Sequence, residues 1–166
     1  MKLLSLRYFI PGRLSISQSS FLLEFLLRYK EIKGRDKQTN EEVVKYYPYL
    51  PAIFEWRGKR SRPIEGLLDS GSDGVVMPLE MAQYLGLDLV PDKKPMNVVG
   101  ARIPCFTSKV DIIIGRAGRY CSTIDDVVVK IPQVGDTPIL FGRNPVFELF
   151  TITFFEKDKK FLIKPC

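Results

Sequence analysis

Short apolar runs, each closed by glycine, proline or a charged turn, fill the sequence from Tyr46 onward and set the class of fold. Residues 50–56 and 63–68 are two such runs, and the residues between them, 57–60, have the composition of a hairpin turn. Valine, isoleucine, phenylalanine and tyrosine are frequent in these runs, and these residue types favour strands. The pattern predicts an all-β fold with one or two short helices.

The rest of the chain continues this alternation of strands and turns. We expect a strand at residues 75–77 and then a helix from Pro78 to Leu85, because proline is tolerated at the first helical position and apolar residues recur there at helical spacing. Gly86 should end this helix. The further predicted elements are strands at 95–99, 103–114, 119–131, 139–141, 151–155 and 160–163, a short helix at 145–150, a loop at 133–138, and turns at 100–102, 115–118 and 156–159.

The chain divides near residue 45 into two predicted parts. Residues 1–44 form an N-terminal extension with one possible helix at 20–33, where apolar side chains can share one face before Gly34. Residues 35–42 are polar and are interpreted as a linker. A docking helix, a partner-binding arm, a mobile appendage and a segment added by an upstream start codon all remain open for this part. Residues 45–166 form the β-rich domain.

Composition limits the chemistry that the chain can perform. The sequence contains no histidine, which excludes Ser-His and Cys-His catalysis and histidine-ligated metal sites within one type of chain. The three cysteines, Cys105, Cys121 and Cys166, are far apart and form no zinc-binding or disulfide pattern. We therefore expect no metal and no cofactor, and carboxylates and lysine remain as the main catalytic candidates.

Charge and hydropathy bear on possible partners. The net charge of +6 comes partly from basic residues within 57–62 and 157–160, and a basic surface can attract nucleic acid. No aromatic residues interleave with these charges, so we interpret them as turn residues and expect no nucleic-acid partner. No stretch reaches the roughly 20 apolar residues that span a bilayer. Arg7 interrupts the apolar N-terminus, which lacks a signal-peptide cleavage site. We expect a cytoplasmic protein with no membrane partner.

Residues 67–73 are the most informative segment. An apolar strand ends in Asp69, and a small hydroxyl residue, Ser70, and then Gly71 follow at once. The strand fixes the carboxylate, Gly71 lets the backbone turn closely, and Ser70 can hydrogen-bond to a neighbouring loop. Taken alone, however, the three residues favour an ordinary turn between strands, because Asp, Ser and Gly are the usual turn formers.

Four features in order make residues 46–156 resemble the retropepsins, the homodimeric aspartic proteases of retroviruses and their cellular relatives. Residues 66–73 are similar to the family motif of apolar residues, Asp, Thr or Ser, Gly, Ala or Ser, and Asp, and residues 75–77 are similar to the strand after it. The glycine-bearing hairpin around Gly100 resembles the family's flap. Residues 139–144 resemble the second signature, in which apolar residues precede Gly-Arg-Asn or Gly-Arg-Asp and a short helix.

The resemblance implies a retropepsin-like acid protease β-barrel that forms half of a two-fold homodimer and hydrolyses protein or peptide substrates with a water molecule. Asp69 is then one of two catalytic carboxylates, and the same residue of the partner supplies the other. The remaining implied site residues are Ser70, Gly71 and Asp73 in the active-site loop and beside the substrate backbone, Asp73 with Arg143 as a structural ion pair, and Val99, Gly100 and Ala101 in the flap.

Three other interpretations remain open. The first is a catalytically inactive module of the same fold that binds peptides or dimerises, although the intact Asp69-Ser70-Gly71 argues against it. The second is a basic nucleic-acid-binding β-domain, which salt-dependent binding would reveal. The third is a Ser-Lys hydrolase that uses Ser70, although nothing in the sequence places a lysine beside it.

Overall fold

Strands make up most of the structure and the helices are short, which confirms the predicted all-β class. The computed structural model describes residues 24–98, 101–116 and 119–166. The strands are β1 (Phe25–Arg28), β2 (Lys30–Arg35), β3 (Glu42–Tyr47), β4 (Tyr49–Trp56), β5 (Lys59–Arg60), β6 (Ile64–Leu68), β7 (Val75–Val76), β8 (Val90–Pro91), β9 (Met96–Val98), β10 (Ala101–Ile103), β11 (Cys105–Arg116), β12 (Arg119–Pro132), β13 (Leu140–Phe141), β14 (Phe150–Phe155) and β15 (Lys160–Pro165). The helices are the α-helix α1 (Leu79–Leu85), the short π-helix η1 (Arg143–Phe147) and the short 3-10 helix η2 (Glu156–Asp158).

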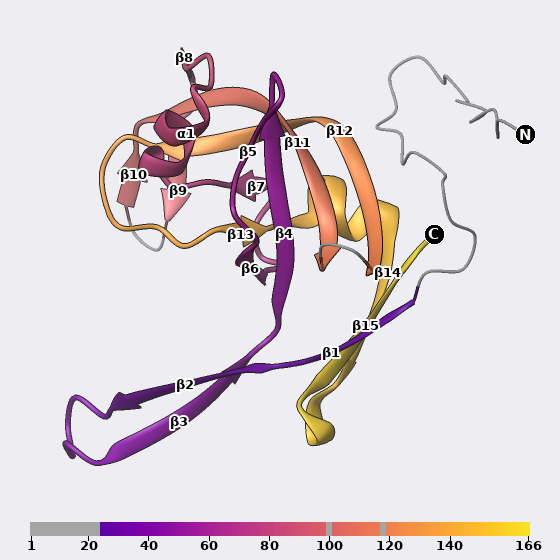
Figure 1. Ribbon diagram of the computed structural model, residues 1–166. Helices are drawn as coiled ribbons and strands as arrows, with labels where there is room; N and C mark the ends of the chain where they lie inside the picture. Colours follow the sequence, from indigo (N-terminus) through magenta and orange to yellow (C-terminus); the bar gives the residue numbers. More distant parts are fainter. Residues whose placement is uncertain (1–23, 99–100, 117–118) are drawn as a thin grey trace, which may run out of the picture.

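Six of these strands close into a barrel (Figure 1). The order around it is β4, β6, β13, β7, β12 and β11, and antiparallel pairing of β11 with β4 completes the ring. Three smaller sheets are separate from the barrel sheet, namely β1-β15-β14, β9-β10 and the hairpin β2-β3. Figure 1 shows this hairpin as a two-stranded ribbon that projects away from the barrel.

The barrel is filled by side chains that alternate along its strands. In β4 the side chains of Leu50, Ala52 and Phe54 are fully buried, while the residues between them are partly exposed. The ring of Phe54 stacks on that of Phe141 from β13, with centroids 6.1 Å apart. Each such buried large side chain contributes roughly 1.5–3 kcal/mol of transfer free energy. The period-two burial explains why the apolar runs of the sequence form strands.

The short strand β13 lies between β6 and β7. It runs parallel to β6 and antiparallel to β7, so three segments that are distant in the sequence meet side by side. Gly66 permits this close approach, because a Cβ atom on it would lie 2.5 Å from the ring of Phe141 and 2.7 Å from Ile139. This arrangement brings the two segments of the sequence that carry the expected active-site motifs together.

Several local predictions are confirmed. Residues 57–58 turn between β4 and β5, and α1 follows Pro78 and ends at Gly86, whose φ of 71° is left-handed. The predicted C-terminal hairpin is β14 and β15, joined through η2. The short helix expected at 145–150 is present with earlier bounds, as η1, and Phe150 already belongs to β14. No helix in the described ranges is long and apolar enough to cross a membrane.

The helix predicted at residues 20–33 is wrong over the part that the structure describes. β1 pairs with β15, with Phe25 opposite Ile163, and β2 pairs with β3. The expected polar linker is the turn of that second hairpin, where Asp36 Oδ1 accepts hydrogen bonds from the backbone of Gln38 and Thr39. A contiguous apolar run is compatible with both the helical period and the strand period. Pairing with the edge of β15 favours the strand.

Candidate functional site

Asp69 directly follows β6 and is fixed by three hydrogen bonds. Its backbone N–H donates to the carbonyl of Phe141 at 3.0 Å, and its carbonyl accepts from the N–H of Ser72 at 3.1 Å. Its side-chain Oδ1 accepts from the N–H of Gly71 at 2.9 Å. Asp69 is half-buried, while Ser70 and Gly71 are exposed. The loop therefore presents an oriented carboxylate at the surface, with one oxygen already bonded.

The segment after β13 braces this loop from the other side. The N–H groups of Arg143 and Asn144 donate to the carbonyls of Ser72 and Asp73, both at 2.9 Å. Ser72 Oγ closes the loop internally by donating to the carbonyl of Gly74 at 2.9 Å. Backbone hydrogen bonds thus join the loop at Ser72 and Asp73 to the segment after β13, and such networks rigidify a site.

Gly142 makes that bracing possible. A Cβ atom on Gly142 would lie 2.6 Å from the carbonyl oxygen of Ser72 and closer still to that of Gly74. Its φ of −89° is available to any residue, so the requirement for glycine is steric and not conformational. The two backbones approach too closely here for a side chain of any size.

The structure brings Asp73 and Arg143 together, and Nη2 of Arg143 donates to Oδ1 of Asp73. The side chain of Asp73 is 89% exposed and that of Arg143 is 59% exposed. The large stabilisation expected for a buried pair therefore does not apply to the isolated chain, because exposed ion pairs contribute only about 0–1 kcal/mol. In the single chain this pair orients the end of the loop more than it stabilises the fold.

The expected flap is only partly described. Val99 and Gly100 lie outside the described residues, and Ala101 opens β10 with an exposed side chain. β9 and β10 pair with each other, with Ala101 opposite Val98, and form a separate two-stranded sheet. The hairpin predicted on this part of the chain is present, and its relation to a bound peptide stays a prediction.

Sequence reasoning missed three contributions to the site. In the sequence, Ser72 and Gly142 stand out only as members of motifs, although a hydroxyl residue inside an Asp-Ser-Gly-Ser-Asp turn is a common backbone acceptor or donor. Pro48 gave no signal at all, yet its carbonyl accepts from the N–H of Leu68 at 3.0 Å, next to Asp69. A contact between residues twenty positions apart in sequence cannot be read from either segment alone.

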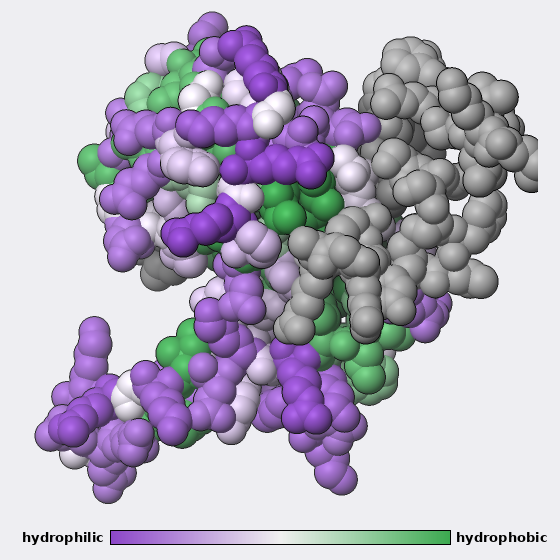
Figure 2. All heavy atoms as spheres, in the orientation of Figure 1, coloured by the Kyte–Doolittle hydropathy of each residue, from purple (hydrophilic) through white to green (hydrophobic). Residues whose placement is uncertain are grey.

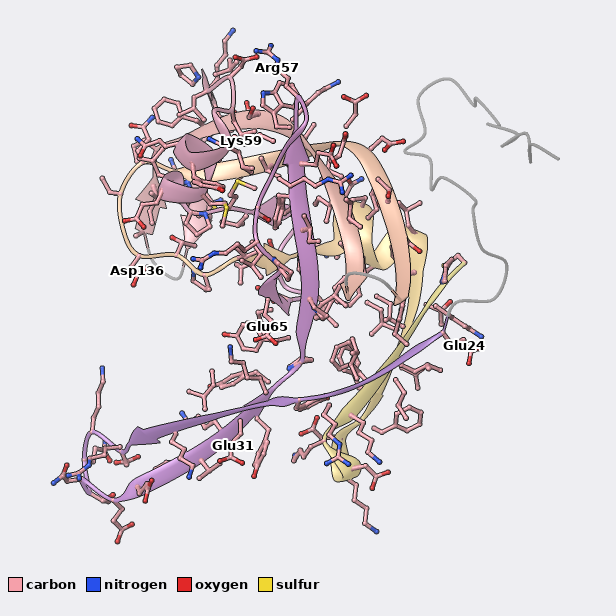
Figure 3. The ribbon with its side chains drawn as sticks, viewed as in Figure 1. Glu24, Glu31, Arg57, Lys59, Glu65 and Asp136 are labelled. Atoms are coloured by element: carbon pink, nitrogen blue, oxygen red, sulfur yellow. The ribbon has the colours of Figure 1, made fainter. Side chains whose placement is uncertain are left out.

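Other charged groups have structural partners. Lys30 Nζ lies 2.7 Å from Glu65 Oε2, and this hydrogen bond is the main cause that raises the pKa of Lys30. Figure 3 shows Glu65 between the barrel and the hairpin β2-β3. Burial, and after it the charge of Asp92, raises the pKa of the Cys105 thiol. Within the described ranges, no group of three or more His, Cys, Asp or Glu side chains could hold a metal ion.

The basic residues around the β4–β5 turn are also largely paired. Arg57 binds Asp88 and Arg60 binds Glu55, both at 2.7 Å, while the Lys59 ammonium lies 4.6 Å from the centroid of the Tyr84 ring. Figure 3 places Arg57 and Lys59 at the end of the barrel away from Glu65. This cluster ties the hairpin tip to α1 and its surroundings, which fits the interpretation as turn residues.

Comparison with known proteins identifies the fold through structure alone. No protein-family model matches the chain, and no curated protein matches it in sequence. Its structure is similar to that of a retropepsin-like aspartic protease from Rickettsia conorii, with a TM-score of 0.56 and 15% identity over 91% of this chain and 94% of that one. The EIAV protease complexed with the inhibitor HBY-793 aligns with a TM-score of 0.46 and 18% identity over 62% of this chain and 88% of its own. The chain has a retropepsin-like fold.

Proposed function

We propose that this protein is an aspartic endopeptidase that works as a homodimer, with Asp69 of each copy forming the catalytic pair. The observation that carries the proposal is the Asp69 carboxylate, held at the end of β6 by Gly71 N–H and by the backbone bond to Phe141. An ordinary surface turn needs no second segment to brace it, whereas this loop is bonded to residues 141–144 at Asp69, Ser72 and Asp73. The retropepsin-like fold adds support.

The chemistry needs two carboxylates around one water molecule. Two like charges about 3 Å apart cannot both ionise, so the pair retains one proton between them. The ionised carboxylate accepts a proton from the water as it attacks the scissile carbonyl, and the protonated carboxyl donates to the carbonyl oxygen. The proton then passes to the leaving amine. No cofactor enters these steps.

A second copy is required because the sequence has one Asp-Ser-Gly segment and no Asp-Thr-Gly. A two-fold axis beside Asp69 places the same residue twice in one site, and a two-fold interface uses the same surface of both copies. Ser70 is proposed to hydrogen-bond across this axis and Gly71 to contact the substrate backbone. The hairpin that includes Val99, Gly100 and Ala101 is proposed to close over an extended peptide.

The test is cleavage of a diverse peptide mixture from pH 4 to pH 7 by the wild type, by Asp69→Asn and by Asp158→Asn. Asp158 is an exposed aspartate in η2, so its variant carries the same chemical change away from the proposed site. We expect cleavage by the wild type and the control and none by Asp69→Asn. Cleavage that survives in Asp69→Asn would refute the assignment.

A folded, dimeric wild type that binds peptides without cleaving any would instead support the inactive module of the same fold. Peptide binding in that case would still depend on the loop at residues 69–74, because it contains the exposed backbone groups of the site. The cytoplasmic location and the division of the chain near residue 45 stay predictions from the sequence.

A further inference from the structure

The hairpin formed by β2, β3 and their turn, residues 30–47, is here called the arm. Within the described residues its two strands pair only with each other, and every residue of β2 is exposed. Figure 2 shows the arm standing clear of the barrel with an open gap between them. An isolated two-stranded hairpin is marginally stable in water, so the arm requires a surface that covers it.

The root of the arm adjoins the candidate active site. Pro48 joins β3 to β4, and its carbonyl accepts the hydrogen bond from Leu68, the residue before Asp69. Tyr49 lies opposite Leu67 in the pairing of β4 with β6. The Lys30 ammonium binds Glu65 and lies 5.2 Å from the centroid of the Tyr49 ring. The arm therefore leaves the barrel at the end of β6 that carries Asp69.

The two faces of the arm differ. Antiparallel pairing places Ile32 beside Lys45 and Gly34 beside Val43 on one face, here called the groove face. Tyr47 lies on the same face. A groove of about 500 Å³ runs along it and is lined by these residues and by the turn. The opposite face holds Glu31, Lys33, Glu42, Val44 and Tyr46. On this face Glu31 lies 3.8 Å from Lys33 Nζ and accepts a hydrogen bond from the Tyr46 hydroxyl.

The groove face continues toward the active-site loop. The ring of Tyr47 lies 6.4 Å from that of Tyr49, which stands at the root. Beyond the root, a pocket of about 750 Å³ is lined mainly by proline and isoleucine side chains, with Lys30 and Glu65 at its polar part. Two hollows thus flank the root of the arm, one with mixed polar and apolar lining along the groove face and one with mainly apolar lining beside the start of β6.

We propose that the groove face of the arm binds a second copy of this chain, so that two arms embrace the two barrels of one homodimer. This inference rests on the proposed function, since pairing two Asp69 residues brings the partner to the end of the barrel from which the arm extends. Standard interfaces use about 20–30 residues on each side, so the groove face of the arm and the loop at 69–74 would form part of such an interface and not the whole of it. Figure 2 shows open space beside the arm, which this proposal assigns to the partner.

The test compares Ile32→Glu with Val44→Glu in the full chain by sedimentation velocity at micromolar concentrations. Ile32 is 38% exposed and Val44 is 41% exposed, both are β-branched, and they lie on opposite faces of the same hairpin. We expect Ile32→Glu to raise the dimer dissociation constant at least tenfold and Val44→Glu to leave it close to that of the wild type. Circular dichroism checks that both variants stay folded.

A further variant replaces residues 33–44 by Asn-Gly, which favours a tight hairpin turn between Ile32 and Lys45. This shortened arm should yield a folded monomer. A dimer as tight as the wild type with Ile32→Glu or with the shortened arm overturns the proposal, as does equal weakening by both glutamates or a wild type that is monomeric throughout. Asp69→Asn should remain dimeric, so loss of cleavage and loss of the dimer are separate outcomes.

Discussion

Replacing Gly142 by alanine tests the packing on which the site is built. The added Cβ would lie 2.6 Å from the carbonyl oxygen of Ser72, whereas ordinary contacts of this kind exceed 3.4 Å. Because the obstructing atoms are backbone carbonyl oxygens and not the ends of flexible side chains, the loop itself must shift. Overpacking of this kind costs about 1–3 kcal/mol, and losing the bond from Arg143 N–H to Ser72 adds about 1 kcal/mol.

We therefore expect Gly142→Ala to lower the free energy of unfolding by about 2–4 kcal/mol and the melting temperature by roughly 5–10 °C. Urea denaturation followed by circular dichroism measures the first quantity, and a thermal scan measures the second. Peptide cleavage should fall by more than the unfolded fraction explains, since the displaced loop is the one that holds Asp69.

Gly74→Ala is the matched control for this prediction. A Cβ atom on Gly74 would meet its nearest neighbour, the carbonyl oxygen of Asn144, at an ordinary 3.6 Å. The change is chemically the same and lies in the same loop, so we expect a stability difference within about 0.5 kcal/mol of zero. Equal stability of the two variants would refute the argument that close backbone approach at Gly142 holds the loop.

Two further predictions concern pairs that the structure shows. Arg143→Ala should lower the free energy of unfolding by only about 0–1 kcal/mol in urea, because the pair with Asp73 is exposed; a loss above about 3 kcal/mol would contradict this prediction, since only the breaking of a buried pair costs that much. Burial, and after it the hydrogen bond to Glu156, raises the pKa of Tyr29 to about 12. The stability that Tyr29 contributes should be complete below pH 10 and be lost as the pH rises from 10 to 12, and this pH dependence should be absent in Tyr29→Phe when unfolding is followed across that range.

The parts of the fold that the sequence predicts are those with local causes. An apolar run closed by a turn predicts β4. A proline, followed by apolar residues at helical spacing and then a glycine, predicts α1. The carboxylate at the end of β6 follows from an apolar run that stops at Asp69. Each of these signals lies within about ten neighbouring residues, so no knowledge of the rest of the molecule is needed.

The parts that the sequence does not predict depend on distant partners. The N-terminal run becomes β1 because the edge of β15 is available to it, more than 130 positions later in the chain. The glycine requirement at Gly66 arises from the ring of Phe141, and that at Gly142 from the carbonyls of Ser72 and Gly74. Such contacts set the geometry of the site, although neither partner indicates the other in the sequence.

The hydrogen bond from Leu68 N–H to the carbonyl of Pro48 connects two proposals that otherwise stand apart. One end of this bond precedes Asp69, and the other is the root of the arm. If the arm binds a second copy, its position is transmitted through a backbone contact to the residue next to the carboxylate. A partner that settles against the arm therefore also fixes where its own Asp69 lies relative to the first, because in a two-fold dimer both roots are constrained in the same way. Under these two proposals, the arm helps to set the distance between the two carboxylates.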